Sequence, residues 1–189
     1  MIPEQFFSMW LGANLIALAI LGVAFWRAPL ARWIFIAMFL WAAVVNTLTA
    51  LQSPWEYTAY AALTPFTGYQ HFIEGVFSRH VAAFVLPIAA GQLLISLLLG
   101  RSERWRQWGE RGAMVFLFAI TPLGVGSGFP FPLIAIAALV VMEKELFVAQ
   151  HFPRPVERHV PIAAAPGASL AYARPREHRW HLPSLHWRH

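Results

Sequence analysis

The chain contains no cysteine and no aspartate, and charged residues of any kind are scarce. Without cysteine, disulfides, thiolate catalysis and cysteine-based metal sites are excluded. Charged residues make up 12% of the 189 residues, about half the share in a typical soluble domain, whereas hydrophobic residues make up 58%. The composition therefore predicts a membrane protein. Because basic clusters in such proteins mark the cytoplasmic face, the formal net charge of +5 does not predict nucleic-acid binding.

Long apolar stretches dominate the first three quarters of the sequence. Each is long enough for a transmembrane helix, and such helices are predicted near residues 6–26, 33–51, 80–99 and 113–142. Pro87 predicts a kink in the third helix, and Gln92 offers an amide for a contact between helices. The tyrosines and tryptophan of the long loop after residue 51 are typical of a segment at the level of the lipid headgroups.

These features predict an all-α fold, an integral membrane four-helix bundle formed by residues 1–142. The remaining residues, 143–189, form a basic, histidine-rich tail that we expect to be extended or disordered. The fourth helix is expected to be broken, because Thr121–Pro132 holds three glycines and three prolines. This stretch either crosses the membrane once or turns back at the break. Its total length favours a single crossing.

Arginines indicate which connections are cytoplasmic. The connections at 27–32 and 101–112 hold six arginines, so they should lie inside and the N-terminus and the long loop outside. The tail then lies outside if the fourth stretch crosses once, and inside if it turns back. Arginines alternating with Trp105 and Trp108 also suit contact with anionic headgroups. We expect a multi-pass protein of a bacterial inner (plasma) membrane, with the bilayer, other membrane subunits or a second copy as partners.

A break in a helix within the membrane is a candidate functional element, here formed by Gly124, Gly126, Ser127 and Gly128. Unwound backbone at that depth must be covered by protein or line a wet cavity, and in some transporters it forms the substrate site. The more common explanation is a packing kink that admits a neighbouring segment. The sequence favours packing, because it contains only one such break.

Histidines supply two weak candidate metal sites. His71 and Glu74 share a helical face, but His80 falls about half a turn out of phase. In the tail, two His-x-x-His pairs could bind zinc or copper: His178, His181, His186 and His189. An interfacial polar cluster and a basic membrane-touching tail are the more common explanations. We predict no metal and no cofactor, since transmembrane haem requires histidines within facing helices.

Signatures of catalysis are missing from the sequence: Gly-x-Ser-x-Gly and His-Glu-x-x-His do not occur, and the apolar stretches carry no paired carboxylates. No catalytic residue is predicted, and an enzyme is the less favoured class. The leading hypothesis is a non-enzymatic accessory or scaffold subunit of a membrane assembly. A small channel or carrier using the Gly124–Gly128 break and a membrane redox component using His71, Glu74 and His80 are the alternatives.

The stretch Leu86-Pro87-Ile88-Ala89-Ala90-Gly91-Gln92-Leu93-Leu94-Ile95, followed by Gly100-Arg101 and a return span, resembles the DoxX-like group of small bacterial membrane proteins. The resemblance covers the third predicted helix, its charged turn and the start of the fourth. It implies a helical membrane protein, with redox or thiol-stress systems as the setting of some members. Gln92 stands where an acidic residue is expected in that group, and no catalytic residue is implied for this chain.

Overall fold

The computed structural model describes the backbone of residues 4–151 and the side chains of residues 7–151, and this part of the chain is all-helical. Five long helices and a short one are joined by 3₁₀ and π segments. In chain order the elements are α1 (Glu4–Trp26), α2 (Ala28–Gln52), η1 (Pro54–Leu63), α3 (Thr67–Phe72), η2 (Ile73–Phe77), α4 (Val81–Leu99), α5 (Glu103–Ile120), η3 (Thr121–Ser127) and α6 (Phe131–His151).

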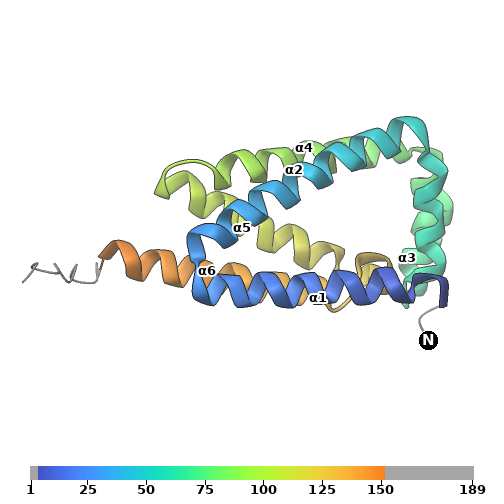
Figure 1. The fold of residues 1–189 in the computed structure, drawn as a ribbon. Helices are drawn as coiled ribbons and strands as arrows, with labels where there is room; N and C mark the ends of the chain where they lie inside the picture. Colours follow the sequence, from blue (N-terminus) through green and yellow to red (C-terminus); the bar gives the residue numbers. More distant parts are fainter. Residues whose placement is uncertain (1–3, 152–189) are drawn as a thin grey trace, which may run out of the picture. The chain divides into compact units, whose positions relative to one another are not determined.

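The first three predicted transmembrane helices are α1, α2 and α4 of the structure (Figure 1). Helices α1 and α2 are antiparallel and separated only by Arg27, with Pro29 in the first turn of α2, where its missing N–H costs nothing. Pro87 lies inside α4 as expected. All three helices are long and apolar enough to cross a membrane, which is compatible with a membrane location.

The long loop between α2 and α4 is folded into short helices. η1, a 3₁₀ helix, is followed by α3 and by the π-helical turn η2, and together they run across one end of the long helices (Figure 1). The stretch predicted as a long loop is thus helical over most of its length. We call η1, α3 and η2 the crossing segment.

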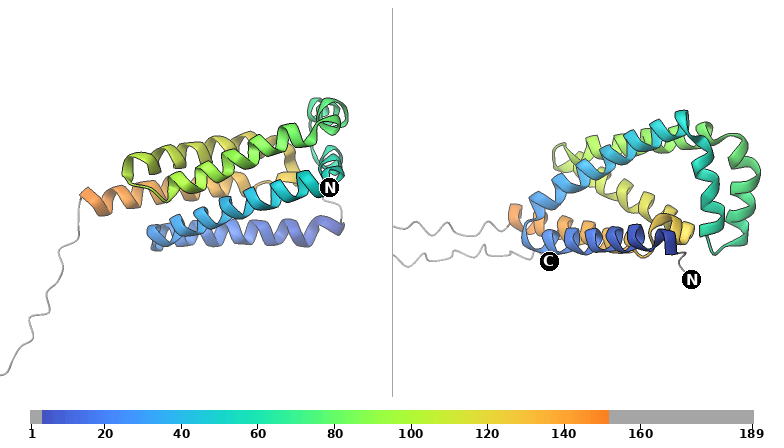
Figure 2. Two further views of the ribbon diagram at one scale, coloured as in Figure 1. Left: turned by 90° about the horizontal axis from the view of Figure 1, so that it is seen from above. Right: turned by 45° about the vertical axis from the view of Figure 1, so that its right-hand side comes forward.

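The predicted fourth helix is instead a hairpin of two helices. α5 ends at Ile120, the chain turns through η3, and α6 returns antiparallel to α5 and parallel to α1 (Figures 1 and 2). Residues 113–142 therefore belong to two opposed arms and not to one broken helix, because the glycines and prolines of η3 reverse the chain. The outcome matches the turning-back alternative, and α6 ends at the end of the bundle that holds Arg27 and Arg101.

Two further boundaries differ from the sequence prediction. α5 already begins at Glu103, so the charged connection is the first half of a helix that packs on α4 and α6. α6 continues to His151, so residues 143–151 are helical and do not belong to an extended tail. The predictions for the tail beyond residue 151 concern residues outside the described part of the chain.

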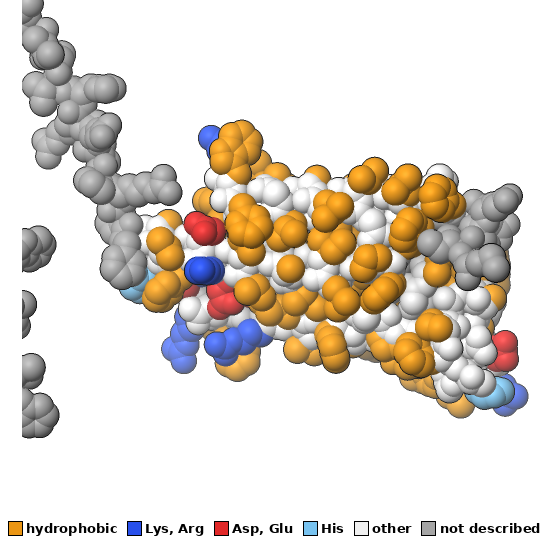
Figure 3. Space-filling view, turned by 90° about the horizontal axis from the view of Figure 1, so that it is seen from below, with side chains coloured by type: hydrophobic (Ala, Val, Ile, Leu, Met, Phe, Trp, Pro, Cys, Tyr) orange, Lys and Arg blue, Asp and Glu red, His pale blue; other side chains and the backbone are white. Residues whose placement is uncertain are grey.

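Small side chains let the helices approach closely in the main core. Alanines at positions 24, 28, 31, 113, 135 and 138 are buried there, with Phe35, Phe39 and Leu139 filling the larger spaces. Close approach through small residues is typical of helix packing in membranes, where lipid removes the hydrophobic incentive to associate. The surface is correspondingly apolar. Figure 3 shows hydrophobic side chains over the length of one face and charged ones gathered at its two ends.

Candidate functional site

Two glycines with positive φ make the turn at η3. Gly124 has φ +61° and Gly128 has φ +72°, a region that L side chains rarely adopt. The turn is fastened to α1, because Asn14 Nδ2 donates to the Gly128 carbonyl at 3.0 Å and Trp10 Nε1 donates to the Phe129 carbonyl at 2.6 Å. The irregular backbone therefore has protein partners.

The glycines also admit the crossing segment. A Cβ added to Gly124 would lie 2.6 Å from Pro65 Cδ, and one added to Gly126 would lie 2.5 Å from Tyr60 Cδ1. Thr64 Oγ1 donates to the Pro122 carbonyl at 2.8 Å across the same contact. These distances support the packing interpretation of the Gly124–Gly128 break, since the space in front of the glycines is filled by η1 and its following loop.

A partly open cavity of about 480 Å³ lies beside this contact, lined by the crossing segment, α2, α4, α5, η3 and the start of α6. Its size falls within the usual range of ~300–1,000 Å³ for small-molecule sites. No lining residue carries a charge, and aromatic rings are prominent. The lining residues are Met38, Phe39, Ala42, Asn46, Tyr57, Tyr60, Tyr69, Phe72, Ile73, Phe77, Val85, Ile88, Gln92, Phe116, Leu117, Ala119, Ile120, Leu123, Gly126, Ser127 and Phe131.

A short hydrogen-bonded chain supplies polarity on the α2–α4 side of this cavity. The Tyr57 hydroxyl donates to Asn46 Oδ1 at 2.9 Å, and Asn46 Nδ2 donates to Gln92 Oε1 at 2.8 Å. The Gln92 amide thus joins two helices, which confirms the prediction made for it. Gln92 is buried, yet its amide nitrogen donates to none of the described residues. The Gln92 amide nitrogen, at the end of this series of hydrogen bonds, is therefore a donor without an acceptor among the described residues.

Burial also alters the ionisation of the tyrosines of η1. Loss of water around the hydroxyl raises the pKa of Tyr57 and of Tyr60 above the ordinary value, with the negative charge of Glu56 adding to the effect. Both hydroxyls stay neutral at physiological pH. The cavity is consequently an uncharged environment, suited to an uncharged guest.

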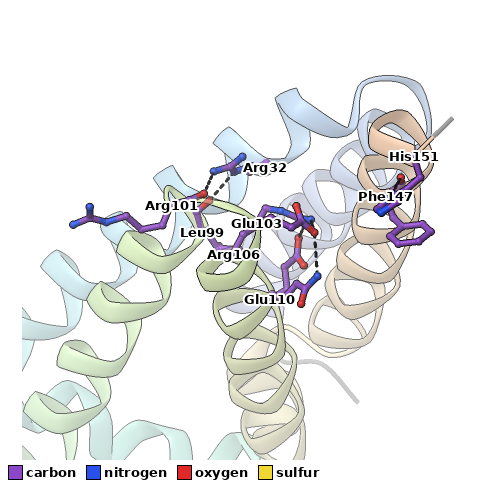
Figure 4. Close-up of polar contacts among 9 residues, drawn as sticks. Arg32, Leu99, Arg101, Glu103, Arg106, Glu110, Phe147 and His151 are labelled. Carbon is purple, nitrogen blue, oxygen red and sulfur yellow. Dashed lines mark hydrogen bonds and ion pairs between the residues drawn. The ribbon is translucent and has the colours of Figure 1, made fainter. Parts of the chain in front are cut away.

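At the end of the bundle away from the cavity, the first half of α5 carries a buried group of charged side chains. Arg106, 2% exposed, bonds to Glu103 at 2.5 Å and to Glu110, which is fully buried (Figure 4). Burial raises the pKa of Glu110 to about 7 against the opposing pull of Arg106, and the charge of Glu143 contributes. One oxygen of Glu103 and one of Glu110 have no hydrogen-bond partner among the described residues.

Beside this group, Arg32 closes the turn between α4 and α5. Its Nε donates to the Leu99 carbonyl at 2.6 Å, and its Nη2 donates to the Arg101 carbonyl at 2.8 Å (Figure 4). These carbonyls end α4, where helical partners are lacking and positive charge is favoured. The charged residues at this end are thus partly engaged in fastening the helices to one another.

The histidine candidates form no metal site within residues 7–151, where no three His, Cys, Asp or Glu side chains come together. His71 lies in α3, Glu74 in η2 and His80 just before α4, and all three side chains are exposed. His178, His181, His186 and His189 lie outside the described residues.

Sequence reasoning missed the cavity and the buried ion group. Tyr57 and Tyr60, predicted to lie at the level of the lipid headgroups, also line the cavity, whereas Trp55 is 66% exposed. The number of aromatic residues between positions 52 and 78 was the available signal. For the ion group the signal was the helical spacing of Glu103, Arg106 and Glu110, which places them on one face.

Comparison of the chain with protein-family models, with curated proteins and with solved structures gives no match.

Proposed function

We propose that this is a multi-pass protein of the bacterial inner membrane whose Arg27 and Arg101 end faces the cytoplasm. Support comes from the three long apolar helices and from the gathering of charges at the ends of the bundle. Basic side chains at the proposed cytoplasmic end stand beside exposed aromatic rings. Arg27 lies 5.9 Å from the Trp26 ring centre and Arg111 lies 5.5 Å from that of Trp108, an arrangement suited to anionic headgroups.

The hairpin formed by α5 and α6 is compatible with this orientation in the membrane. Their apolar halves, residues 112–120 and 131–142, would be about 14 and 18 Å long, shorter than a hydrocarbon core of ~30 Å. The turn at η3 is covered by η1 and bonded to α1, as irregular backbone at membrane depth must be. The chain beyond His151 then continues from the cytoplasmic end, so the tail is proposed to be cytoplasmic.

Within that membrane the proposed role is a non-enzymatic accessory subunit of an assembly. The observation that carries it is an outward groove of about 380 Å³ between α2 and α4, lined only by apolar side chains and one threonine. Three alanines, Ala43, Ala89 and Ala90, lie along it, and small residues allow the backbone of a partner helix to approach. The proposed occupant is a transmembrane helix of a partner subunit.

Crosslinking in membranes followed by purification in mild detergent tests this role. Ala90→Trp fills the groove, whereas Ala19→Trp adds the same bulk to an exposed position of α1 outside it. We expect a defined partner with the native protein and with Ala19→Trp, and its loss with Ala90→Trp. A native protein that purifies as a monomer without a partner, or a partner retained by Ala90→Trp, would count against the proposal.

The other two candidate roles receive less support. A channel through Gly124–Gly128 would need space that Tyr60 and Pro65 occupy. A redox component using His71, Glu74 and His80 would need side chains that converge, and these are exposed on separate elements. The resemblance to the DoxX-like group stays a prediction, and the proposed role does not depend on it.

A further inference from the structure

We propose that the cavity beside η3 binds one uncharged lipophilic molecule that carries an oxygen acceptor at one end and reaches the site from the bilayer. This goes beyond the proposed accessory role, because the cavity lies on the inner side of α2 and α4, apart from the outer groove. The inference rests on three properties of the cavity: its lining, its polar end and its mouth.

The lining determines the charge of the guest. A charged molecule transferred from water or a headgroup region into this cavity would find no opposite charge among the lining residues to offset the loss of its hydration. Aromatic rings such as those of Phe39, Phe77 and Phe116 offer dispersion contacts to a chain or a ring. An uncharged apolar body is therefore the chemistry that this surface accepts.

The polar end determines which atom the guest presents. In the hydrogen bonds that link Tyr57, Asn46 and Gln92, each of the two amide oxygens accepts a bond, whereas the Gln92 amide nitrogen donates to none of the described residues. Successive bonds polarise one another, so this donor is strengthened. An alcohol, ketone or ester oxygen would complete the chain, whereas a plain hydrocarbon would leave it incomplete.

The mouth determines the route of entry. Four lining residues are exposed: Tyr69 and Phe72 of the crossing segment, Ile88 of α4 and Ala119 of α5. Ile88 belongs to a helix long and apolar enough to cross a membrane, and it is 42% exposed. The opening therefore faces the hydrocarbon region in the proposed orientation, so the guest enters sideways from lipid.

Photolabelling of the full-length protein in phospholipid nanodiscs tests the site. The probe is hexadecanol with a diazirine in mid-chain, and labelled peptides are located by mass spectrometry. We expect labelling within residues 38–46 or 116–123, competed by unlabelled hexadecanol and not by hexadecyl phosphate. Equal competition by hexadecyl phosphate would overturn the uncharged class. Label spread over the outward face of α1 would overturn the site.

Variants separate the cavity from general lipid contact. Ala119→Trp places a ring in the mouth on an exposed helix face, and Ala137→Trp puts the same ring on an exposed face of α6 that lines no described cavity. We expect Ala119→Trp to remove most of the cavity labelling and Ala137→Trp to preserve it. Unchanged labelling with Ala119→Trp would overturn the proposal, provided that circular dichroism shows a native helix content.

Gln92→Leu tests the polar end. The change removes the whole amide and is made together with Asn46→Leu, because Asn46 Nδ2 would otherwise lose its acceptor and become a new donor in the cavity. Hexadecanol should then lose its advantage over hexadecane as a competitor by about five-fold, the value of one ordinary hydrogen bond. Binding of hexadecane itself should persist, which separates this effect from collapse of the cavity. An advantage of hexadecanol that survives in this double variant would show that the amide does not select the guest.

Discussion

The ring of Tyr60 stands over the backbone of Gly126, so close that a methyl group on the glycine would lie 2.5 Å from Tyr60 Cδ1. This contact joins η1 to η3, two segments far apart in the sequence. It explains why the hairpin turn is rich in glycine, since any other residue would push the crossing segment away.

Gly126→Ala should therefore destabilise the protein by about 1–3 kcal/mol, the usual cost of overpacking, measured as a lower melting temperature in detergent. Gly22→Ala in α1 is the control, because a Cβ added to Gly22 has no neighbouring atom within 4 Å and alanine has a higher helix propensity than glycine. In the background Tyr60→Ala the same Gly126→Ala change should cost much less. An equal cost in both backgrounds would show that the two residues are not coupled.

Removal of the Arg32 side chain should loosen the turn between α4 and α5. Arg32→Met keeps the apolar stem and removes two hydrogen bonds from a charged group to the Leu99 and Arg101 carbonyls, a loss of about 1–3 kcal/mol. Arg27→Met removes a neighbouring exposed arginine and should have little effect. Comparable melting temperatures for the two variants would contradict the capping role of Arg32.

Glu110 should make stability depend on pH in the direction opposite to a paired surface carboxylate. Its folded pKa of about 7 exceeds its ordinary value of 4.5, so the folded protein binds the proton more tightly than the unfolded chain. The associated stability is fully present below pH 4.5 and is lost as the pH rises to 7, by at most about 3 kcal/mol.

Glu110→Gln should remove this component and be more stable than the native protein at pH 8, with little difference at pH 4.5. Glu56→Gln, an exposed glutamate of η1, is the control and should leave the pH profile unchanged. Thermal unfolding between pH 4.5 and 8 gives the answer. If the melting temperatures of Glu110→Gln and of the native protein change with pH in parallel, Glu110 is not the source of the pH dependence of stability.

Membrane placement can be tested with single cysteines, because the native chain has none. Leu18 and Leu94 are 53% and 55% exposed in the protein, so the protein's own fold does not shield a cysteine there from a membrane-impermeant maleimide. We expect no labelling at these two positions in membranes and ready labelling at exposed Arg104 in inverted vesicles. Labelling at Leu18 or Leu94 would exclude the proposed spans.

The direction of α6 gives a separate topology prediction. Because α6 returns to the end that holds Arg27 and Arg101, a green fluorescent protein fused after His189 should fluoresce in the cytoplasm. A periplasmic reporter at the same point should be silent. The opposite pair of results would place the Arg27 and Arg101 end on the periplasmic side and overturn the proposed orientation.

Hydropathy and arginine placement were sufficient to predict α1, α2 and α4, because each element depends mainly on the length of an apolar run. They did not predict the hairpin, since a glycine- and proline-rich break is compatible with a kink and with a reversal, and the total length of the apolar run favoured a single crossing. The reversal is stabilised by contacts that no local pattern contains, such as Asn14 with Gly128 and Thr64 with Pro122.

The candidate site was predictable only in part. The Gly124–Gly128 break was recognised and its packing role follows from Tyr60 and Pro65, but the cavity beside it depends on how α2, α4 and α5 diverge. Burial of Arg106 and Glu110 was missed because a segment dense in charge resembles a surface helix. Which of its faces meets α6 is decided by tertiary packing.

The α5–η3–α6 hairpin has a consequence for biogenesis. Neither apolar arm, residues 112–120 or 131–142, is long enough to be inserted as an independent transmembrane segment. A charged residue flanks each arm, Arg111 before the first and Glu143 after the second. In the proposed membrane placement we therefore expect the two arms to enter the bilayer together, once α1 and the crossing segment are in place to contact the turn. Pulse-labelled chains truncated after residue 125 should accordingly leave α5 unintegrated and open to protease.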